Sequence, residues 1–360
     1  MSSHSYSLTE RWLHWLALEP ASVRQLSFDL ERNFALPRRA GMPDPAAHAI
    51  YVCGLARSGT TLLLHLLAQV DDLRSLSYRD MPFPLAPNLW RRISSFAQRK
   101  AVAAPRIHDD GMLVDFDSPE GFEEVFWRTF TRYSANGAAL STTPPSREAM
   151  EAFADYRALI ANPRGREGNG ATRRYLSKNN NNLLRLQLLC DEDAANVVLV
   201  YRDPLAAARS MHRTHAGFGH EQAKSDYMRR YMGWLCHYEF GLDHRPFGFA
   251  AGAMDPRLQP SQLDYWLDYW CAVHEYILRA SGPALHLLDY DTLCRSPMQT
   301  LDSLFDVLNI KMDCEILAAQ IKPYRAEVEQ NFDRALLRRA EGIHRALRER
   351  MENVNMIVAA

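Results

Sequence analysis

The sequence lacks several features that would assign it to a special class of protein. Its 360 residues contain only six cysteines, widely scattered and without a Cys-x-x-Cys pair, which gives no support to a disulfide framework or a zinc ribbon. No apolar run approaches the roughly 18 residues of a membrane span, and the first residues lack the basic start and apolar core of a signal peptide. We therefore expect a reduced, cytoplasmic protein with no membrane segment.

An excess of charge of either sign is also lacking. Lys and Arg together number 42 and Asp and Glu 43, so the formal net charge is −1. Proteins that bind nucleic acid or anionic membranes through their general charge are usually basic, and neither partner is expected here. Any site for an anion must be local.

One stretch near the N-terminus, residues 49–69 with the sequence AIYVCGLARSGTTLLLHLLAQ, has the anatomy of a phosphate-binding loop. An apolar run suited to a strand meets a loop that begins at Gly54, and a leucine-rich helical segment follows Thr61. Gly54 and Gly59 allow a tight turn and a close approach to an anion, while the unpaired amides of residues 58–61 open the helix. The alternative is a glycine turn that only connects strand and helix.

The loop also lacks the lysine of the usual phosphate-binding loop. In the pattern G-x-x-x-x-G-K-[ST], a lysine follows the second glycine, but this chain has Thr60 there and carries its cation earlier, at Arg57. Ordinary ATPases and GTPases use that lysine together with Mg²⁺ held by a strand-borne aspartate, and no such aspartate is obvious. These absences argue against a nucleoside triphosphate as the ligand.

A second segment, Asn196–Met211 with the sequence NVVLVYRDPLAAARSM, lies far along the chain. Its first part, residues 197–201, is a continuous apolar run typical of a strand buried on both faces. Arg202 and Asp203 end the strand, Pro204 begins a helix, and Ser210 follows Arg202 by about two helical turns.

Together the two segments resemble the sulfotransferases that use 3′-phosphoadenosine 5′-phosphosulfate (PAPS), particularly the group whose loop reads P-R-S-G-T-T. Ala56 stands where that group often has proline. The resemblance implies a P-loop-type three-layer α/β fold, PAPS as the donor, and transfer of a sulfuryl group without a metal. The acceptor would be a hydroxyl or amine of a small molecule or carbohydrate.

The resemblance also implies roles for individual residues. The 5′-phosphosulfate would be held by the loop, namely by Arg57, Ser58, Gly59, Thr60 and Thr61. The 3′-phosphate would be held by Arg202 and Ser210. Lys178, at the end of an expected strand over residues 173–177, would stabilise charge that develops on the leaving phosphate. The polar residues 179–182 that follow could equally serve as helix caps.

Two residues are candidates for the general base that accepts the proton of the acceptor. Asp80 lies just beyond an expected strand over residues 73–78, about where the family often has an acidic base, but it could instead form an ion pair with Arg79, Arg91 or Arg92. His108 precedes a helix expected to begin near Ser118, and its ordinary pKa suits proton transfer. His108 could also be a surface residue beside two carboxylates.

We expect a single α/β domain around a mostly parallel sheet of about five strands. Residues 1–46 would form an N-terminal helical layer, residues 49–310 the core, and residues 311–360 a C-terminal helical extension. Trp12 and Trp15 would either shape a substrate pocket or pack in the core or at an interface. The glycine-rich, lysine-containing donor segment of the family is not evident near Lys322 and Arg325.

Two other functions remain open. A P-loop nucleotide or small-molecule kinase would require Mg²⁺-dependent binding of ATP. A non-catalytic nucleotide-binding protein would bind the donor product without turning over any acceptor. The sequence is compatible with a homo-oligomer and does not identify the acceptor.

Overall fold

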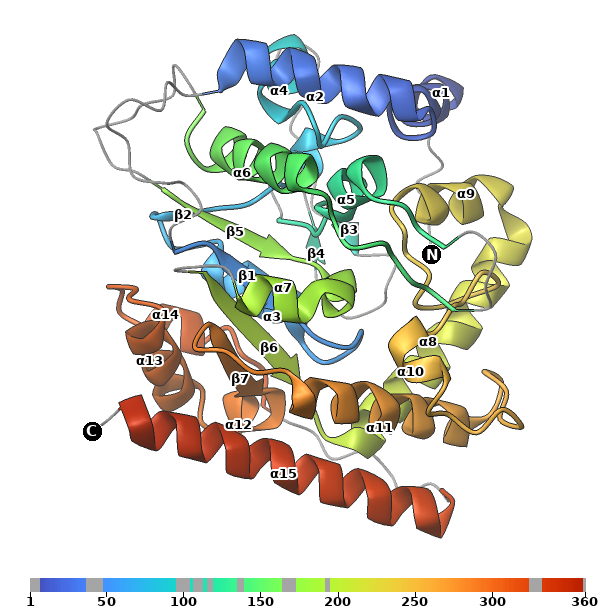
Figure 1. Ribbon diagram of the computed structural model, residues 1–360, viewed down its shortest axis with the longest axis vertical. Coiled ribbons are helices and arrows are strands. Elements are labelled where there is room, and N and C mark those ends of the chain that lie inside the picture. Colours follow the sequence, from blue (N-terminus) through green and yellow to red (C-terminus); the bar gives the residue numbers. More distant parts are fainter. Residues whose placement is uncertain are drawn as a thin grey trace.

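A five-stranded parallel sheet forms the centre of the protein (Figure 1). The computed structural model describes residues 7–36, 48–94, 104–105, 113–114, 119–134, 139–163, 173–191, 195–323 and 332–358. The strand order is β2-β5-β1-β6-β7, and each neighbouring pair is parallel. The bounds are β1 Ile50–Cys53, β2 Leu73–Arg74, β5 Arg174–Lys178, β6 Asn196–Tyr201 and β7 Leu285–Asp289. The predicted α/β fold with a parallel sheet of five strands is confirmed.

Helices cover both faces of the sheet because its central strands are apolar on both sides. In β1, Tyr51 and Cys53 belong to one hydrophobic cluster, whereas Ile50 and Val52 belong to the other. The second cluster is completed by α3 Thr60–Leu67, α12 Tyr290–Arg295, α13 Pro297–Val307 and α14 Glu315–Ala318. The first is completed by α5 Glu124–Phe130, α6 Arg147–Ala161, α7 Leu186–Cys190, α8 Pro204–Lys224, α9 Asp226–Trp234, α10 Gly248–Ala251, α11 Leu263–Arg279 and α15 Arg334–Val358.

The topology places a crevice at the carboxyl end of β1. The chain runs from β1 through α3 to β2 at one edge and returns through β5, while β6 and β7 lie on the other side of β1. Ligands of open α/β sheets bind at such a reversal, outside the carboxyl ends of the strands. The segments after β1, β5 and β6 therefore meet in one place.

The N-terminal layer consists of α1 Leu8–Leu18 and α2 Ala21–Ala35, which are separated at Pro20 as expected. The face that packs on the core differs from the expectation. Leu18 and Phe28 are buried, whereas Trp12 is 58% exposed and Trp15 43% exposed. Neither tryptophan lies in the core or lines the cavity described below.

Two predicted boundaries were wrong. The strand expected over residues 73–78 is only the two-residue β2, because the chain turns into a short 3-10 helix, η1 Tyr78–Asp80, which leads to α4 Pro87–Ser94. The helix expected near Ser118 begins at Glu124, since Pro119 instead pairs with Ser77 in an isolated β-bridge. A small antiparallel pair, β3 Ala104–Pro105 and β4 Leu113–Val114, and a second 3-10 helix, η2 Asn180–Arg185, complete the described elements. None of the described helices is both long and apolar enough to cross a membrane.

Candidate functional site

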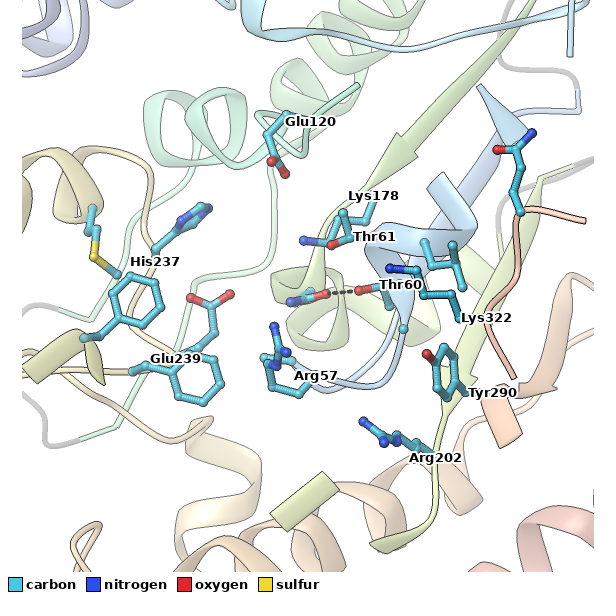
Figure 2. Close-up of a pocket in the computed structure, with 18 residues that line it drawn as sticks. Arg57, Thr60, Thr61, Glu120, Lys178, Arg202, His237, Glu239, Tyr290 and Lys322 are labelled. Carbon is cyan, nitrogen blue, oxygen red and sulfur yellow. Dashed lines mark hydrogen bonds between the residues drawn. The ribbon is translucent and has the colours of Figure 1, made fainter. Parts of the chain in front are cut away.

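Adjacent strands deliver basic and aromatic side chains to one cavity of about 330 Å³ (Figure 2). Lys178 is the last residue of β5, Arg57 follows β1, Arg202 directly follows β6, and Tyr290 directly follows β7. Because these strands are parallel neighbours, their carboxyl ends share an edge of the sheet. Arg57 and Arg202, which lie 145 positions apart in the sequence (202 − 57), therefore line the same cavity.

The loop after β1 has the backbone that close approach to an anion requires. Gly59 has φ 100° and precedes α3, so the amides that open this helix face the cavity region without helical partners. A Cβ atom at Gly59 would overlap the ring of Tyr290. Arg57 also has a positive φ, 73°, and its Nε donates a hydrogen bond of 3.0 Å to Ser210 Oγ. A non-glycine residue is disfavoured by about 1 kcal/mol in this left-handed backbone conformation. Such residues are typical of functional sites.

Ser58 Oγ, in the loop, and Arg202 Nε are two of the buried polar groups that have no hydrogen-bond partner within the described residues. Ser177 Oγ and Asp291 Oδ1, at the same edge of the sheet, are two others. The Arg202 guanidinium lies 5.2 Å from the ring centroid of Tyr290, and its nearest carboxylate is Asp291 at 3.9 Å. Buried polar groups in folded proteins nearly always have partners. Two such groups beside a row of cations fit a site built for an anion.

Burial shifts the pKa values of two groups next to Arg202. Burial raises the pKa of Asp291, and one of its oxygens already accepts a 2.6 Å hydrogen bond from the amide of Asp203. Burial also raises the pKa of Tyr290 to about 12. The ring of Tyr290 faces the Arg202 guanidinium. Thr60 donates a 3.2 Å hydrogen bond to Asn180, which ties the loop to the segment after β5.

Not every predicted site residue reaches the cavity. Arg57, Gly59, Thr60, Thr61, Lys178 and Arg202 line it. Ser58 and Ser210 do not line it, although Ser210 holds Arg57 through the hydrogen bond described above. His108 lies outside the described residues.

Asp80 occupies a structural position. Its carboxylate is fully buried, accepts a 2.7 Å hydrogen bond from Arg91 of α4, and accepts a second one of 2.8 Å from the amide of Ser77. Asp80 does not line the cavity. Of the two interpretations left open by the sequence, this geometry favours the ion pair with Arg91.

The cavity also contains residues that the sequence did not single out as site residues. Glu120, expected in the first turn of a helix, is instead buried at the cavity wall and accepts a 2.7 Å hydrogen bond from Tyr78. His237 and Glu239 approach from the segment after α9, on the opposite side from Arg202 and Lys322 (Figure 2). Apart from the aromatic content of residues 231–260, no local pattern marks these residues, because their placement depends on how α8 and α9 pack.

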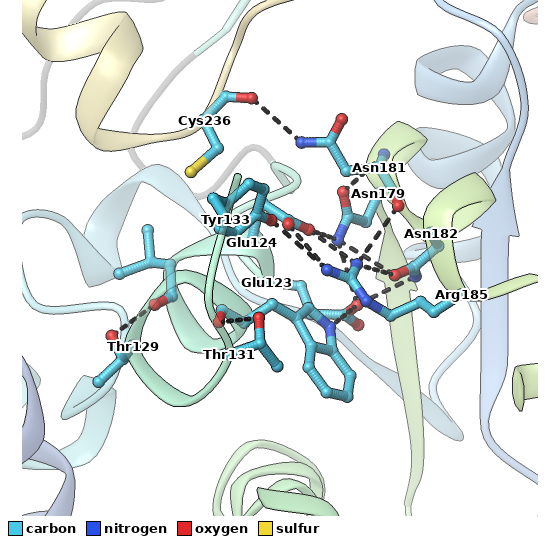
Figure 3. Close-up of polar contacts among 12 residues, drawn as sticks. Glu123, Glu124, Thr129, Thr131, Tyr133, Asn179, Asn181, Asn182, Arg185 and Cys236 are labelled. Carbon is cyan, nitrogen blue, oxygen red and sulfur yellow. Dashed lines mark hydrogen bonds and ion pairs between the residues drawn. The ribbon is translucent and has the colours of Figure 1, made fainter. Parts of the chain in front are cut away.

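A network of buried polar side chains holds the segment after β5 (Figure 3). Arg185 and Glu124 form an ion pair of 2.9 Å with side chains that are 3% and 2% exposed. Asn179 donates to Glu124 at 2.6 Å and caps η2 through its other side-chain atom, as the capping alternative predicted. Asn181 donates a 3.1 Å hydrogen bond to the carbonyl of Cys236, directly before His237. The network therefore fixes two walls of the cavity.

No group of three or more His, Cys, Asp or Glu side chains that could hold a metal ion occurs among the described residues. The acidic cluster around Asp109 lies outside them.

The chain was compared with known proteins. Solved structures similar to it include the sulfotransferase STF9 from Mycobacterium avium, with 14% identity, coverage of 98% of this chain and 87% of that one, and a TM-score of 0.45. The sulfotransferase STF1 from Mycobacterium tuberculosis has 13% identity, coverage of 91% and 82%, and a TM-score of 0.44. No curated protein gives a significant match. The model of the sulfotransferase family matches residues 49–314, and the chain therefore belongs to this family.

Proposed function

We propose that this sulfotransferase takes its sulfuryl group from PAPS and transfers it to a hydroxyl or amine of a small-molecule or carbohydrate acceptor. The observation that carries the proposal is the convergence of Arg57, Arg202 and the first amides of α3 on one cavity. A doubly phosphorylated nucleotide needs two separate anion sites, and the ends of β1 and β6 supply them. The unpartnered Ser58 Oγ and Arg202 Nε fit the same ligand.

The proposed roles follow the position of each residue. Arg57 and the amides of residues 59–61 hold the 5′-phosphosulfate, and Arg202 binds the 3′-phosphate. The amide of Ser58 instead donates a 3.2 Å hydrogen bond to the carbonyl of Leu55. Ser210 acts chiefly by orienting Arg57, to which it is hydrogen-bonded. Lys322, on the same side of the cavity as Arg202, adds a cation where the family's lysine-containing segment is not evident.

Transfer requires a base for the acceptor's proton and a cation that stabilises the negative charge on the leaving phosphate. The acceptor loses a proton as its oxygen or nitrogen bonds to sulfur, while the bond from sulfur to the phosphate oxygen breaks. Lys178 ends β5 and lines the same cavity as Arg57, where it stabilises the negative charge on the leaving phosphate. Glu120 and His237 line the cavity and are better placed as the base than Asp80, whose carboxylate pairs with Arg91.

The geometry gives less support to a kinase. In a P-loop kinase an acidic residue at a strand end helps to hold Mg²⁺, but the residue directly after β6 is the cation Arg202. Asp203, the next residue, accepts a 2.8 Å hydrogen bond from Ala206 as the N-cap of α8. A non-catalytic nucleotide-binding protein would have the same donor residues, and only turnover distinguishes it.

We further propose a reduced, cytoplasmic setting for the protein. All six cysteines are buried and none forms a disulfide.

Calorimetry with adenosine 3′,5′-bisphosphate, the product left by the donor, tests the proposed function. We expect micromolar or tighter binding without Mg²⁺, and no comparable binding of ATP with or without Mg²⁺. Binding of ATP that requires Mg²⁺ would support the kinase instead. Absence of adenosine 3′,5′-bisphosphate binding would refute the proposal.

A further inference from the structure

The cavity has two chemically different ends. Lys322, Tyr290 and Arg202 lie at one end, and His237 and Glu239 lie at the other, with Arg57 and Lys178 between them (Figure 2). In the proposed function the basic end and the centre are occupied by the donor. The end near Glu239 is then left for the acceptor, and its residues report on the kind of molecule that fits.

The ionisable side chains at this second end are Glu239 and His237. The carboxylate of Glu239 points into the cavity, and no hydrogen bond or ion pair to it is found within the described residues. The carboxylate of Glu120 also points into the cavity from its upper wall. An acceptor that carried its own carboxylate or phosphate would meet two like charges in the cavity.

The cations of the cavity do not offset this effect for an acidic acceptor. Arg57, Lys178, Arg202 and Lys322 are the four basic side chains that line the cavity within the described residues. Bound PAPS brings about four negative charges, from its 3′-phosphate and its phosphosulfate group. The donor therefore neutralises the cations, and the acceptor meets the carboxylates.

The remaining wall at this end is apolar and aromatic. Phe218 of α8 and Phe240 lie with their rings nearly parallel, at 11° and with centroids 6.3 Å apart, and Met232 of α9 lies beside them in the lining. All three are buried, with exposures of 5%, 6% and 8% respectively. Aromatic faces bind an apolar body and also attract cations. The carboxylate of Glu239 and the apolar wall thus both favour a molecule that has an apolar body and a positive charge.

We propose that the acceptor is an apolar or aromatic molecule with two functional groups. One is the hydroxyl or amine that receives the sulfuryl group, and the other is a separate protonated nitrogen that Glu239 binds. The inference rests on the proposed function, because it assigns the rest of the cavity to PAPS. Glu239 then determines specificity and does not act as the base. Acidic sugars and hydroxy acids are excluded as acceptors.

Three phenols of similar size test this inference: tyramine, which has an ammonium group, tyrosol, which is neutral, and phloretate, which has a carboxylate. Their affinities are measured by calorimetry on the enzyme saturated with adenosine 3′,5′-bisphosphate, and their kcat and KM with PAPS. We expect tyramine to bind about tenfold more tightly than tyrosol, and phloretate more weakly than either.

The variant Glu239→Gln should remove the preference for tyramine over tyrosol, mainly through KM. The matched control is Glu221→Gln, since Glu221 is an exposed carboxylate on α8 that pairs with Lys224 outside the cavity. It should leave the preference unchanged.

Several outcomes would overturn the inference. Equal or tighter binding of phloretate would do so, as would binding of none of the three phenols. An equal loss of kcat on all three phenols in Glu239→Gln, with the preference retained, would identify Glu239 as a base instead. The binding of adenosine 3′,5′-bisphosphate, measured in the same experiments, tests the proposed function separately, so the acceptor inference can fail while the donor proposal stands.

Discussion

Two polar clusters lie next to each other at the end of β5, and they differ in how their charges are satisfied. In the network around Arg185 and Glu124, ionised groups are matched within the protein by ion pairs and amide hydrogen bonds (Figure 3). At the cavity, Arg202 Nε lacks a hydrogen-bond partner within the described residues, as does Ser58 Oγ in the adjoining loop. The ionised side chains of the first cluster, which we call the complete cluster, are paired within the protein, although Asn181 Oδ1 has no hydrogen-bond partner within the described residues. We propose that a ligand completes the second, the incomplete cluster.

The difference shows how the fold separates rigidity from binding. A buried ion pair with additional hydrogen bonds adds little net free energy compared with an apolar core, but removing one partner leaves a buried charge. The network therefore fixes geometry, and through Asn181 and Cys236 it fixes both sides of the cavity. At the cavity, the buried Arg202 Nε has no hydrogen-bond partner within the described residues, and we propose that a bound ligand supplies one. Four substitutions test this contrast, in decreasing order of expected effect.

Breaking the complete cluster should destabilise the whole protein. Glu124→Ala leaves the Arg185 guanidinium buried without its counter-charge, and we expect the free energy of unfolding to fall by about 3–5 kcal/mol. Urea unfolding followed by circular dichroism measures this. The control is Glu151→Ala, which removes an exposed ion pair with Arg147 on α6 and should leave the unfolding curve unchanged. An unchanged midpoint in Glu124→Ala would show that the network is not structural.

A side chain at Gly59, in the loop of the incomplete cluster, should greatly weaken the binding of adenosine 3′,5′-bisphosphate. In Gly59→Ala the new methyl group overlaps the ring of Tyr290 at a backbone φ of 100°, so the loop must shift. We expect the affinity for adenosine 3′,5′-bisphosphate to fall by about a hundredfold or more. The double variant with Tyr290→Ala removes the overlap and should recover part of this loss. Wild-type affinity in the single variant would contradict the assigned loop geometry.

Removing a cation from the incomplete cluster should affect binding without affecting stability. Arg202→Met should weaken the binding of adenosine 3′,5′-bisphosphate by about thirtyfold, or about 2 kcal/mol, typical of a hydrogen bond to a charged group. The melting temperature should change little, because Arg202 Nε has no hydrogen-bond partner within the described residues and its ion pair with Asp291 is long, at 3.9 Å. Arg257→Met, at an exposed ion pair with Asp255, serves as the control. Unchanged affinity in Arg202→Met would refute its role as the 3′-phosphate ligand.

Asp80 resembles the complete cluster, because its charge is paired within the protein by Arg91. Asp80→Asn replaces the charge that pairs with Arg91, and we expect a loss of about 1.5 kcal/mol in the free energy of unfolding, with kcat unchanged. Arg91→Gln should give a similar loss, and the two substitutions should not be additive because they remove the same interaction. A large drop in kcat with unchanged stability would instead identify Asp80 as the base.

Local patterns were sufficient to locate the loop after β1 and the strand end at Arg202. They were readable because a loop and its flanking elements are specified by neighbouring residues. Since parallel strands align their carboxyl ends, the sequence also implied that these segments meet. The helical spacing of apolar residues could not identify which face of α1 and α2 packs on the core, and both Trp12 and Trp15 are exposed.

The sequence by itself determined the α/β class with a parallel sheet of about five strands, the glycine loop after β1 and the cation after β6. Only the tertiary structure decided the environment of Asp80, the start of α5, and the cavity wall with Glu120, His237 and Glu239. The reason is the range of the interactions involved. Turns, caps and strand ends depend on contacts between near neighbours, whereas this cavity wall forms where segments more than a hundred positions apart pack against each other.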